Sequence, residues 1–249
     1  MIEPVVIVEE IRPGIMQITM QDRVYKNTFS EELMRGLVRA FNDISLNTRI
    51  KAVILTGYDS YFASGGTQKT LLALQRGEGK FTDVNLYSLA LDCPVPVISA
   101  MQGHGIGGGF VMGLFADIVL LSRESIYTTN FMKYGFTPGM GATLIVAKKL
   151  GLSLAEEMLL GAWNYRGEEL KQRGVPFTVL PRKEVLLYAI ELAQSLAEKP
   201  RHSLVLLKDH LVASLRKELP RVIEEEVMMH SSTFYQSEVK DNIQAVFGK

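Results

Sequence analysis

Apolar residues gather into short runs along the first half of the chain. Two such runs, residues 5–11 and 15–20, are separated by Arg-Pro-Gly, which predicts a β-hairpin. Three longer apolar runs, KAVILTG at 51–57, PVISAMQG at 96–103 and ADIVLLS at 116–122, predict buried parallel strands. Because helix-forming sequence precedes each of these runs, we expect one sheet with crossover connections.

Residues 29–46 have the period of an amphipathic helix. Ser30 suits the N-cap position, and Glu31 and Glu32 fall in the first turn, where the helix dipole favours negative charge. The apolar positions recur every three or four residues and form one face, made of Leu33, Leu37, Phe41 and Ile44.

From about residue 140 onward, helical patterns dominate. Pro200 and Pro220 are each predicted to mark the start of a helix, because proline is best tolerated in the first turn. No repeat or flexible linker interrupts this region, so we expect it to pack on the sheet or on neighbouring subunits. The predicted helical segments are 140–151, 153–161, 167–174, 182–200, 203–219 and 220–248.

Composition narrows the possible functions. A chain of 249 residues with 47% hydrophobic content suits one large domain. Its 27 basic and 27 acidic residues balance, so no global field favours nucleic acid or an acidic membrane surface. Cys93 is the only cysteine and is expected to be a small core residue. The acidic N-terminal stretch and the lack of a long apolar run indicate a cytoplasmic protein without a membrane span.

A glycine-rich loop follows the second buried strand. Residues 103–109 hold five glycines in seven positions. Gly103, Gly105 and Gly108 satisfy the dinucleotide pattern G-x-G-x-x-G, with an acid, Glu124, about sixteen residues later. Only about eight residues separate the last glycine from the next strand, which is short for a Rossmann crossover helix. Glycines needed only for close packing of helix against strand remain an alternative.

A second glycine segment, YFASGGTQ at 61–68, also follows a predicted strand. Two strand ends with bare backbone can aim two N–H groups at one point. Such a pair forms an oxyanion hole, in which preorganised donors meet negative charge as it develops on a carbonyl oxygen. No metal-ligand cluster and no G-x-S-x-G nucleophile motif is present in the sequence.

The ordered set FASGGT, PVISAMQGHGIGGGFVMGLFADIVLLS and FMKYGFTPGMGAT resembles the crotonase (enoyl-CoA hydratase/isomerase) superfamily over nearly the whole chain. The resemblance implies an α/β fold, a ClpP-like spiral of ββα units with a C-terminal helical trimerisation region. It places the α/β core at residues 1–195 and the helical region at 196–249. It also implies that Gly66 and Gly108 supply the two oxyanion N–H groups.

Hydratases of this family use two glutamates, and the matching positions here hold Val111 and Phe131. Neither side chain can move a proton, so hydration is disfavoured. Decarboxylation of an acid vinylogous to a thioester needs no such base. MQGHGIGGG, TNFMKYGFTPGMGAT, YRG at 165–167 and RGVPF at 173–177 resemble the crotonase-fold decarboxylases of polyketide β-branching cassettes. That resemblance implies a 3-methylglutaconyl-type thioester on an acyl carrier protein, converted to the α,β-unsaturated β-methyl thioester.

The resemblance also points to a lysine and a histidine as catalytic residues. Lys80 is expected to grip the departing carboxylate or to supply a proton, and Lys69 is its rival. His230 is expected to assist protonation or positioning. Out of context, a loop lysine is usually a solvated charge, and a histidine on a partly apolar helix is usually a packing residue. His104 is interpreted as structural, and His202 and His210 as surface or interface residues.

The remaining candidates concern binding. Asn130 and Tyr134 are expected to line the acyl pocket, with core packing as an equal alternative, beside an apolar wall built by Val111 and Phe131. Two cations are weak candidates for binding the phosphates of the pantetheine arm, Arg23 and Lys26. No cofactor is expected, because the phosphopantetheine arm belongs to the carrier.

The expected partners are an acyl carrier protein and further copies of this chain, as a homotrimer or a dimer of trimers. Two rival functions stay open on the sequence alone. One is an enoyl-thioester hydratase or isomerase that works with unfamiliar residues, and the other is a non-catalytic scaffold that binds a carrier protein.

Overall fold

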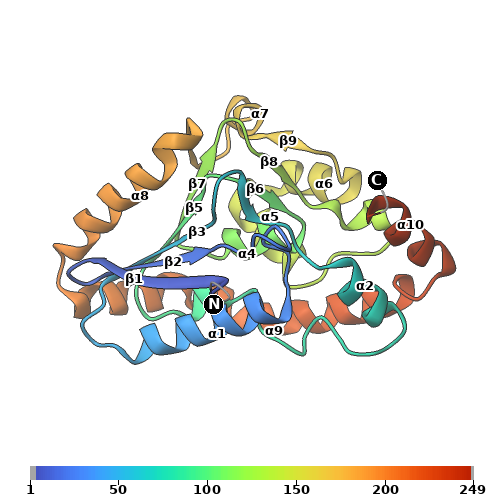
Figure 1. Ribbon diagram of the computed structural model, residues 1–249, viewed down its shortest axis with the longest axis horizontal. Helices are drawn as coiled ribbons and strands as arrows, with labels where there is room; N and C mark the ends of the chain where they lie inside the picture. Colours follow the sequence, from blue (N-terminus) through green and yellow to red (C-terminus); the bar gives the residue numbers. More distant parts are fainter. Residues whose placement is uncertain (1–3, 248–249) are drawn as a thin grey trace.

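The computed structural model describes residues 4–247 and contains two sheets wrapped by helices (Figure 1). The larger sheet has six strands in the order β1-β2-β3-β5-β7-β10. Its strands are parallel except for the β1/β2 pair, where Val6 faces Met20 in an antiparallel hairpin, as predicted. The bounds are β1 Val6–Arg12, β2 Ile15–Met20, β3 Ala52–Thr56, β5 Val97–Met101, β7 Ile118–Ser122 and β10 Thr178–Leu180.

A smaller four-stranded sheet in the order β4-β6-β8-β9 was not foreseen from the sequence. Strands of two or three residues are too short to give a periodic signal. The parallel pairing of β4 with β6 sets Tyr61 opposite His104 and Ala63 opposite Gly105. It therefore brings the two glycine segments side by side. The bounds are β4 Tyr61–Ala63, β6 His104–Ile106, β8 Ile126–Thr128 and β9 Tyr165–Arg166.

Helices cover both faces of the larger sheet. On one face, α8 (Arg182–Ala197) buries Val185, Ala189 and Ala193 against residues of β2, β3, β5 and β7. On the other face lies the main core, which includes the predicted apolar face of α1 (Glu31–Leu46) and the buried Cys93. Ser30 caps α1 as predicted, because its side chain accepts a hydrogen bond from the Leu33 N–H.

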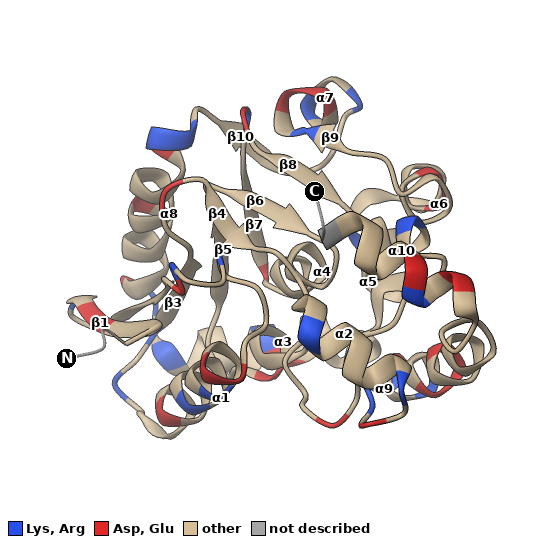
Figure 2. Ribbon diagram, turned by 45° about the vertical axis from the view of Figure 1, so that its right-hand side comes forward, with Lys and Arg blue, Asp and Glu red and all other residues tan. Residues whose placement is uncertain are grey.

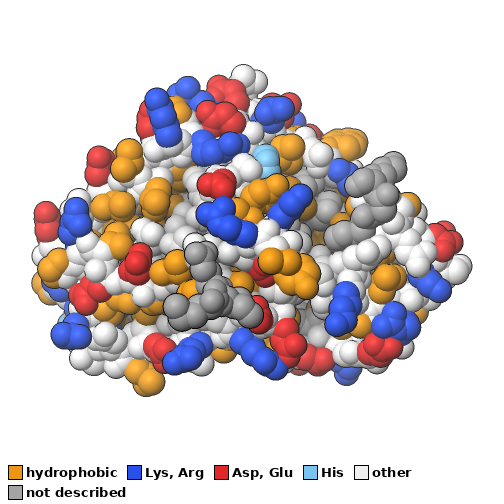
Figure 3. Space-filling view, in the orientation of Figure 1, with side chains coloured by type: hydrophobic (Ala, Val, Ile, Leu, Met, Phe, Trp, Pro, Cys, Tyr) orange, Lys and Arg blue, Asp and Glu red, His pale blue; other side chains and the backbone are white. Residues whose placement is uncertain are grey.

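The other helices pack around this framework, and charges of both signs are mixed along them (Figures 2 and 3). No helix among residues 4–247 is long and apolar enough to cross a membrane. The remaining bounds are α2 Gln68–Gln75, α3 Leu89–Asp92, α4 Gly108–Leu114, η1 Asn130–Tyr134, α5 Ala142–Leu150, α6 Leu152–Gly161, α7 Gly167–Gln172 and α10 Ser237–Phe247.

The longest helix, α9 (Arg201–Thr233), corrects one expectation. Pro200 precedes its first residue, as predicted, but Pro220 lies inside the helix instead of starting a new one. Leu219 and Val222, on either side of Pro220, are both buried in the main core. Proline inside a helix removes a hydrogen bond, at a cost of about 3 kcal/mol. Burial of the helix on both sides of Pro220 therefore offsets this cost.

Candidate active site

The two glycine segments meet at the ends of β4 and β6. A Cβ atom placed on Gly109 would lie 2.2 Å from the carbonyl oxygen of Ala63, so only glycine permits this approach. Gly65 has φ +71°, and a Cβ atom there would lie 3.3 Å from the amide nitrogen of Gly108. The bare backbone therefore serves close contact between two loops, and that contact brings the Gly108 amide beside the Gly65–Gly66 peptide.

The N–H groups of Gly66 and Gly108 are the proposed oxyanion donors. Phe29 fixes the first loop, because its N–H donates to the Gly65 carbonyl at 2.6 Å. Within residues 4–247 neither the Gly66 N–H nor the Gly108 N–H has a hydrogen-bond acceptor. Both glycines line the same cavity. Two unsatisfied main-chain donors at one cavity are what a developing oxyanion requires.

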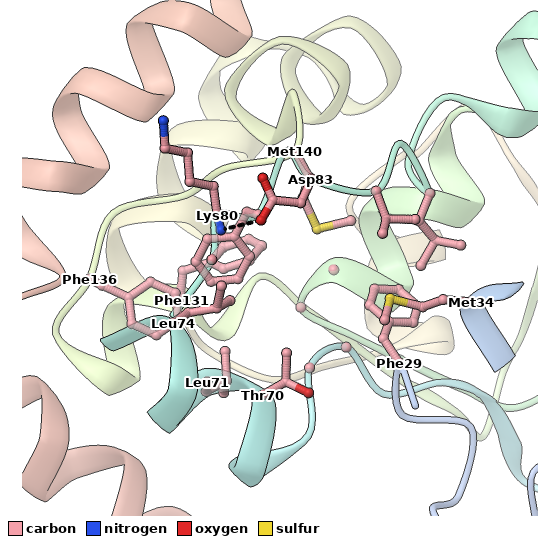
Figure 4. Close-up of a pocket in the computed structure, with 18 of the residues that line it drawn as sticks. Phe29, Met34, Thr70, Leu71, Leu74, Lys80, Asp83, Phe131, Phe136 and Met140 are labelled. Carbon is pink, nitrogen blue, oxygen red and sulfur yellow. Dashed lines mark hydrogen bonds between the residues drawn. The ribbon is translucent and has the colours of Figure 1, made fainter. Parts of the chain in front are cut away.

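The cavity that Gly66 and Gly108 line is named the acyl cavity, after the acyl pocket expected from the sequence. It has a volume of about 230 Å³ and a mostly apolar wall (Figure 4). Two acidic residues, Glu78 and Asp83, also line it from an exposed loop. Glu78 pairs with Arg76 (Nε–Oε1 2.6 Å), and Asp83 accepts the backbone N–H of Lys80 at 2.8 Å. The other side chains on the wall are Phe29, Met34, Thr70, Leu71, Leu74, Phe131, Tyr134, Phe136 and Met140, among others.

The two positions that carry glutamate in hydratases hold apolar side chains with different placements. Phe131 lies on the cavity wall. Val111 is fully buried in α4 and is not part of that wall, so the expectation that Val111 lines the pocket was wrong. Neither position can supply a proton acceptor.

Asn130 and Tyr134 both line the acyl cavity, and Tyr134 is also packed in the main core. They lie one turn apart in η1, and the Asn130 amide donates to the Tyr134 hydroxyl at 3.5 Å. Burial raises the pKa of Tyr134, so its hydroxyl stays protonated near neutral pH. A Cβ atom on Gly107 would lie 2.5 Å from Asn130 Oδ1, which ties this amide to the glycine loop.

The two lysine candidates fall in different places. Lys80 lies on the wall of the acyl cavity, but its side chain extends away from Phe29 and Met34 (Figure 4). Lys69 lies instead in an outer groove, together with Lys26. Ser64 and Thr70 line both the groove and the acyl cavity, so the two spaces are adjacent.

Arg23 lies apart from both spaces. Its guanidinium pairs with Asp59 (Nη1–Oδ2 3.2 Å) and rests 4.6 Å from the ring centroid of Tyr58. Lys26 Nζ is 5.9 Å from the ring centroid of Tyr61 at the groove. Of the two candidate phosphate ligands, the structure therefore places only Lys26 in the groove next to the acyl cavity.

His230 lies in a second cavity of about 270 Å³ on the inner side of α9. Five residues line both cavities and form the wall between them, namely Leu74, Gly79, Lys80, Phe81 and Met140. The Phe81 ring stands edge-on to the imidazole of His230, with centroids 4.7 Å apart. The structure thus brings Lys80 to both cavities, whereas His230 is separated from Gly66 and Gly108 by this wall.

The environment of His230 favours the neutral ring. Nδ1 lies 2.9 Å from the Thr137 carbonyl, which can only accept, so Nδ1 carries the proton. Burial lowers the pKa of His230, although the bond to Thr137 acts in the opposite direction. Nε2 is buried without a hydrogen-bond partner among the described residues. It therefore offers an unused acceptor.

The other three histidines agree with their sequence interpretation. His104 Nδ1 accepts the backbone N–H of Ile126 at 2.9 Å, which is a structural role. His202 and His210 are exposed on α9.

Sequence reasoning missed Phe81, Met140 and Glu226. Met140 adopts φ +65°, and its sulfur would lie 3.0 Å from a Cβ atom on Gly108. Glu226 is buried on α9 and accepts the N–H groups of Gly141 at 2.7 Å and of Thr143 at 2.8 Å, which holds Met140 in place. Of these three residues, only Phe81 stands out in the sequence, as an aromatic residue directly after Lys80 in a polar stretch.

An α/β core that presents two free main-chain amides to an apolar cavity has the geometry that an oxyanion hole requires, which is typical of enzymes that act on carbonyl groups. The family model described as enoyl-CoA hydratase/isomerase matches residues 10–249, and the chain belongs to this family. The crotonase fold expected from the glycine motifs is confirmed.

Several relatives within this family are described more specifically, as decarboxylases. Bacillaene synthase decarboxylase PksI of Bacillus subtilis (strain 168) is 70% identical over 239 residues, which cover 96% of each chain. A structure of a dehydratase/decarboxylase enzyme couple involved in polyketide β-branching superposes with a TM-score of 0.97 at 69% identity, covering 98% of this chain and 100% of that one. The ECH2 decarboxylase domain of CurF from Lyngbya majuscula gives a TM-score of 0.95 at 46% identity, with the same coverage. The expected resemblance to β-branching decarboxylases is confirmed.

Proposed function

We propose that this protein decarboxylates a 3-methylglutaconyl-type thioester on an acyl carrier protein and releases the 3-methyl-α,β-unsaturated thioester. The observation that carries the proposal is the pair of free amides at Gly66 and Gly108, combined with apolar side chains at both hydratase glutamate positions, Val111 and Phe131. The names of the 70% identical relative and of the 69% and 46% identical structures support it.

The chemistry follows from the oxyanion hole. The bond between C4 and the carboxylate breaks, and its electron pair forms a C3=C4 double bond while the C2=C3 pair moves toward the thioester. The charge comes to rest on the thioester oxygen between Gly66 and Gly108. CO₂ leaves into a cavity with an apolar wall, and a proton returned to C4 restores the conjugated thioester. Orientation of the carboxylate and stabilisation of the oxyanion supply the rate.

Lys80 and His230 take the roles of cation and assisting residue in this scheme. Lys80 would turn its ammonium from the outward position toward the substrate carboxylate, which a flexible four-carbon stem permits. His230 is neutral in its present environment, so it acts by positioning the 137–141 turn through Thr137, or by accepting a hydrogen bond at Nε2.

The pantetheine arm would enter through the outer groove past Lys26 and Lys69 and reach the glycines at Ser64 and Thr70. The reaction needs no cofactor, since the arm belongs to the carrier. We also propose a homotrimer or a dimer of trimers, because exposed leucines on the first half of α9 offer an apolar surface for association. These are Leu206, Leu207 and Leu211.

Mass spectrometry of a carrier protein loaded with 3-methylglutaconyl thioester tests the proposal. Loss of CO₂ from the acyl group is expected. Addition of water would indicate a hydratase, and binding of the carrier with an unchanged acyl mass would indicate a scaffold. Turnover that survives the double substitution Lys80→Ala and His230→Ala would remove both residues from catalysis.

A further inference from the structure

A half-buried methionine stands beside one of the proposed oxyanion donors. A Cβ atom added to Gly108 would lie 3.0 Å from the Met140 sulfur and 3.0 Å from Cε2 of Phe29. The buried Gly108 backbone therefore lies in a slot between these two side chains. The Met140 side chain points into the acyl cavity, toward the side where Phe29 and Met34 lie (Figure 4).

The backbone of Met140 adopts a conformation that a side chain disfavours. Met140 has φ +65°, in the left-handed region, and the next residue, Gly141, has φ +71°. A glycine at position 140 would adopt the same conformation without strain. Non-glycine residues held in this region cluster at functional sites. The contact of the Met140 side chain with Gly108 gives this strained position a function.

Glu226 holds the turn that carries Met140. It is 2% exposed, and its carboxylate accepts hydrogen bonds from the Gly141 N–H at 2.7 Å, the Thr143 N–H at 2.8 Å and the Thr143 hydroxyl at 2.6 Å. These N–H groups belong to the start of α5, where a helix has donors without intrahelical partners. No cation pairs with the carboxylate among the described residues, so the turn alone compensates its burial.

Two further side chains of α9 hold the other end of the same turn. His230 Nδ1 donates to the Thr137 carbonyl at 2.9 Å, and Thr233 Oγ1 accepts the Thr137 N–H at 3.2 Å. Glu226, His230 and Thr233 are four and three residues apart, so they share one face of α9. Residues 137–143 are therefore fixed to α9 at both ends.

Resting on the proposed function, we infer that Met140 shields the Gly108 donor from water and that Glu226 is the positioning residue that holds Met140 there. A donor enclosed by apolar side chains meets the developing oxyanion without competition from water, and low local polarity strengthens the interaction. Removal of the Met140 side chain would admit water to the Gly108 N–H. Loss of an acceptor at Glu226 would release the turn and have the same effect.

The carbonyl stretching frequency of a bound thioester tests the shield without turnover. The probe is the pantetheine thioester of 3-methylbut-2-enoic acid, isotopically labelled at the carbonyl carbon, and infrared difference spectra are recorded on the full chain at saturating probe. Two donors in a dry site polarise the carbonyl, so the wild-type band is expected at a lower wavenumber than in water. Met140→Ala should move the band back toward its position in water. Met140→Leu, which restores the volume with the same backbone strain, should restore the lower wavenumber.

Glu226→Gln tests the positioning role. Glutamine keeps one acceptor oxygen but turns an NH₂ group toward a backbone N–H, so the turn loses a hydrogen bond. The band should move as in Met140→Ala, and kcat for decarboxylation should fall about tenfold with KM nearly unchanged. Glu224→Gln is the matched control, since Glu224 is exposed on the same helix, and it should keep the wild-type band and kcat. Thr143→Val removes one donor to Glu226 and should move the band less, in the same direction.

A double substitution separates positioning from general stability. If Glu226 acts through Met140, adding Glu226→Gln to Met140→Ala should change kcat by less than about twofold. Urea unfolding should nevertheless show the same loss of stability from Glu226→Gln in both backgrounds.

A wild-type band in Met140→Ala would overturn the shield. The positioning role would be overturned by a destabilised Glu226→Gln protein with the wild-type band and kcat, or by a further loss of about tenfold in the Met140→Ala background. If Glu226→Gln does not fold, an unmoved band in Thr143→Val overturns that role instead. Failure of the proposed function would appear differently, as a shifted wild-type band without CO₂ release from the carboxylated substrate.

Discussion

Gly65→Ala tests whether the close approach of the two glycine loops sets the oxyanion hole. Gly65 has φ +71°, and a Cβ atom would stand 3.2 Å from the Ile106 carbonyl oxygen and 3.3 Å from the Gly108 nitrogen. The left-handed conformation costs a non-glycine residue about 1–2 kcal/mol. Both neighbours are backbone atoms, one in a paired strand and one at the start of a helix, so relief of the contact must move Gly108 relative to Gly66.

The expected effect on activity is large compared with the effect on stability. Loss of one oxyanion donor costs about 10²–10³ in kcat, and a displaced donor should cost roughly tenfold to a hundredfold. The melting temperature should fall by about 2–8 °C, as the left-handed cost alone predicts for a chain of this size. Steady-state decarboxylation assays and thermal unfolding would be measured on the same protein preparation.

Gly174→Ala provides the matched control. Gly174 has φ +77° and no atom within 4 Å of an added Cβ, so it carries the same backbone strain away from the site. Both variants should lose similar stability, and only Gly65→Ala should lose activity. Wild-type turnover, within threefold, in a destabilised Gly65→Ala protein would refute the reasoning that this contact aligns the amides.

Three further outcomes are expected. Lys80→Met should lower kcat by about a hundredfold, whereas Lys69→Met in the outer groove should mainly raise KM; equal effects on both constants would contradict their assignment to different spaces. Burial lowers the pKa of His230 below 6.5, so the unfolded state binds the proton at a higher pH than the folded state does, and the free energy of unfolding should fall as the pH drops below about 6.5. Urea unfolding at pH 8 and at pH 5 should therefore show a smaller decrease in this free energy for His230→Asn than for the wild type. Lys208→Met should cost about 3–5 kcal/mol in urea unfolding, because it removes the buried ammonium bonded to Asp117 at 2.8 Å; a cost under 1 kcal/mol would contradict that role.

Sequence periodicity was sufficient for the elements that bury continuous apolar faces. The hairpin, α1 and the three apolar runs that became β3, β5 and β7 each combine length with a clear pattern. The small sheet was not predicted because its strands have only two or three residues. The prediction that Pro220 starts a helix was wrong because burial of its neighbours outweighs the preference of proline for the first turn.

The site was predictable only in part, for a related reason. The two glycine segments predicted a pair of backbone donors, and the family resemblance assigned them to Gly66 and Gly108 and located Lys80 and His230 in the sequence. The wall between the two cavities depends on the tertiary placement of Phe81 and Met140, which no local pattern encodes. Glu226 could not be found either, because a buried carboxylate that accepts backbone N–H groups looks in sequence like its exposed neighbour Glu225.

The pairing of β4 with β6 has a consequence for how this fold diversifies. Both proposed oxyanion donors belong to the main chain, so the strand register fixes their position, and most side-chain replacements leave it unchanged. New reactions can then arise elsewhere on the cavity wall, where a single residue such as Phe131 decides whether a base is present. The two backbone N–H groups then stay the same from one enzyme to the next, and a few replaceable side chains on the cavity wall determine the type of reaction.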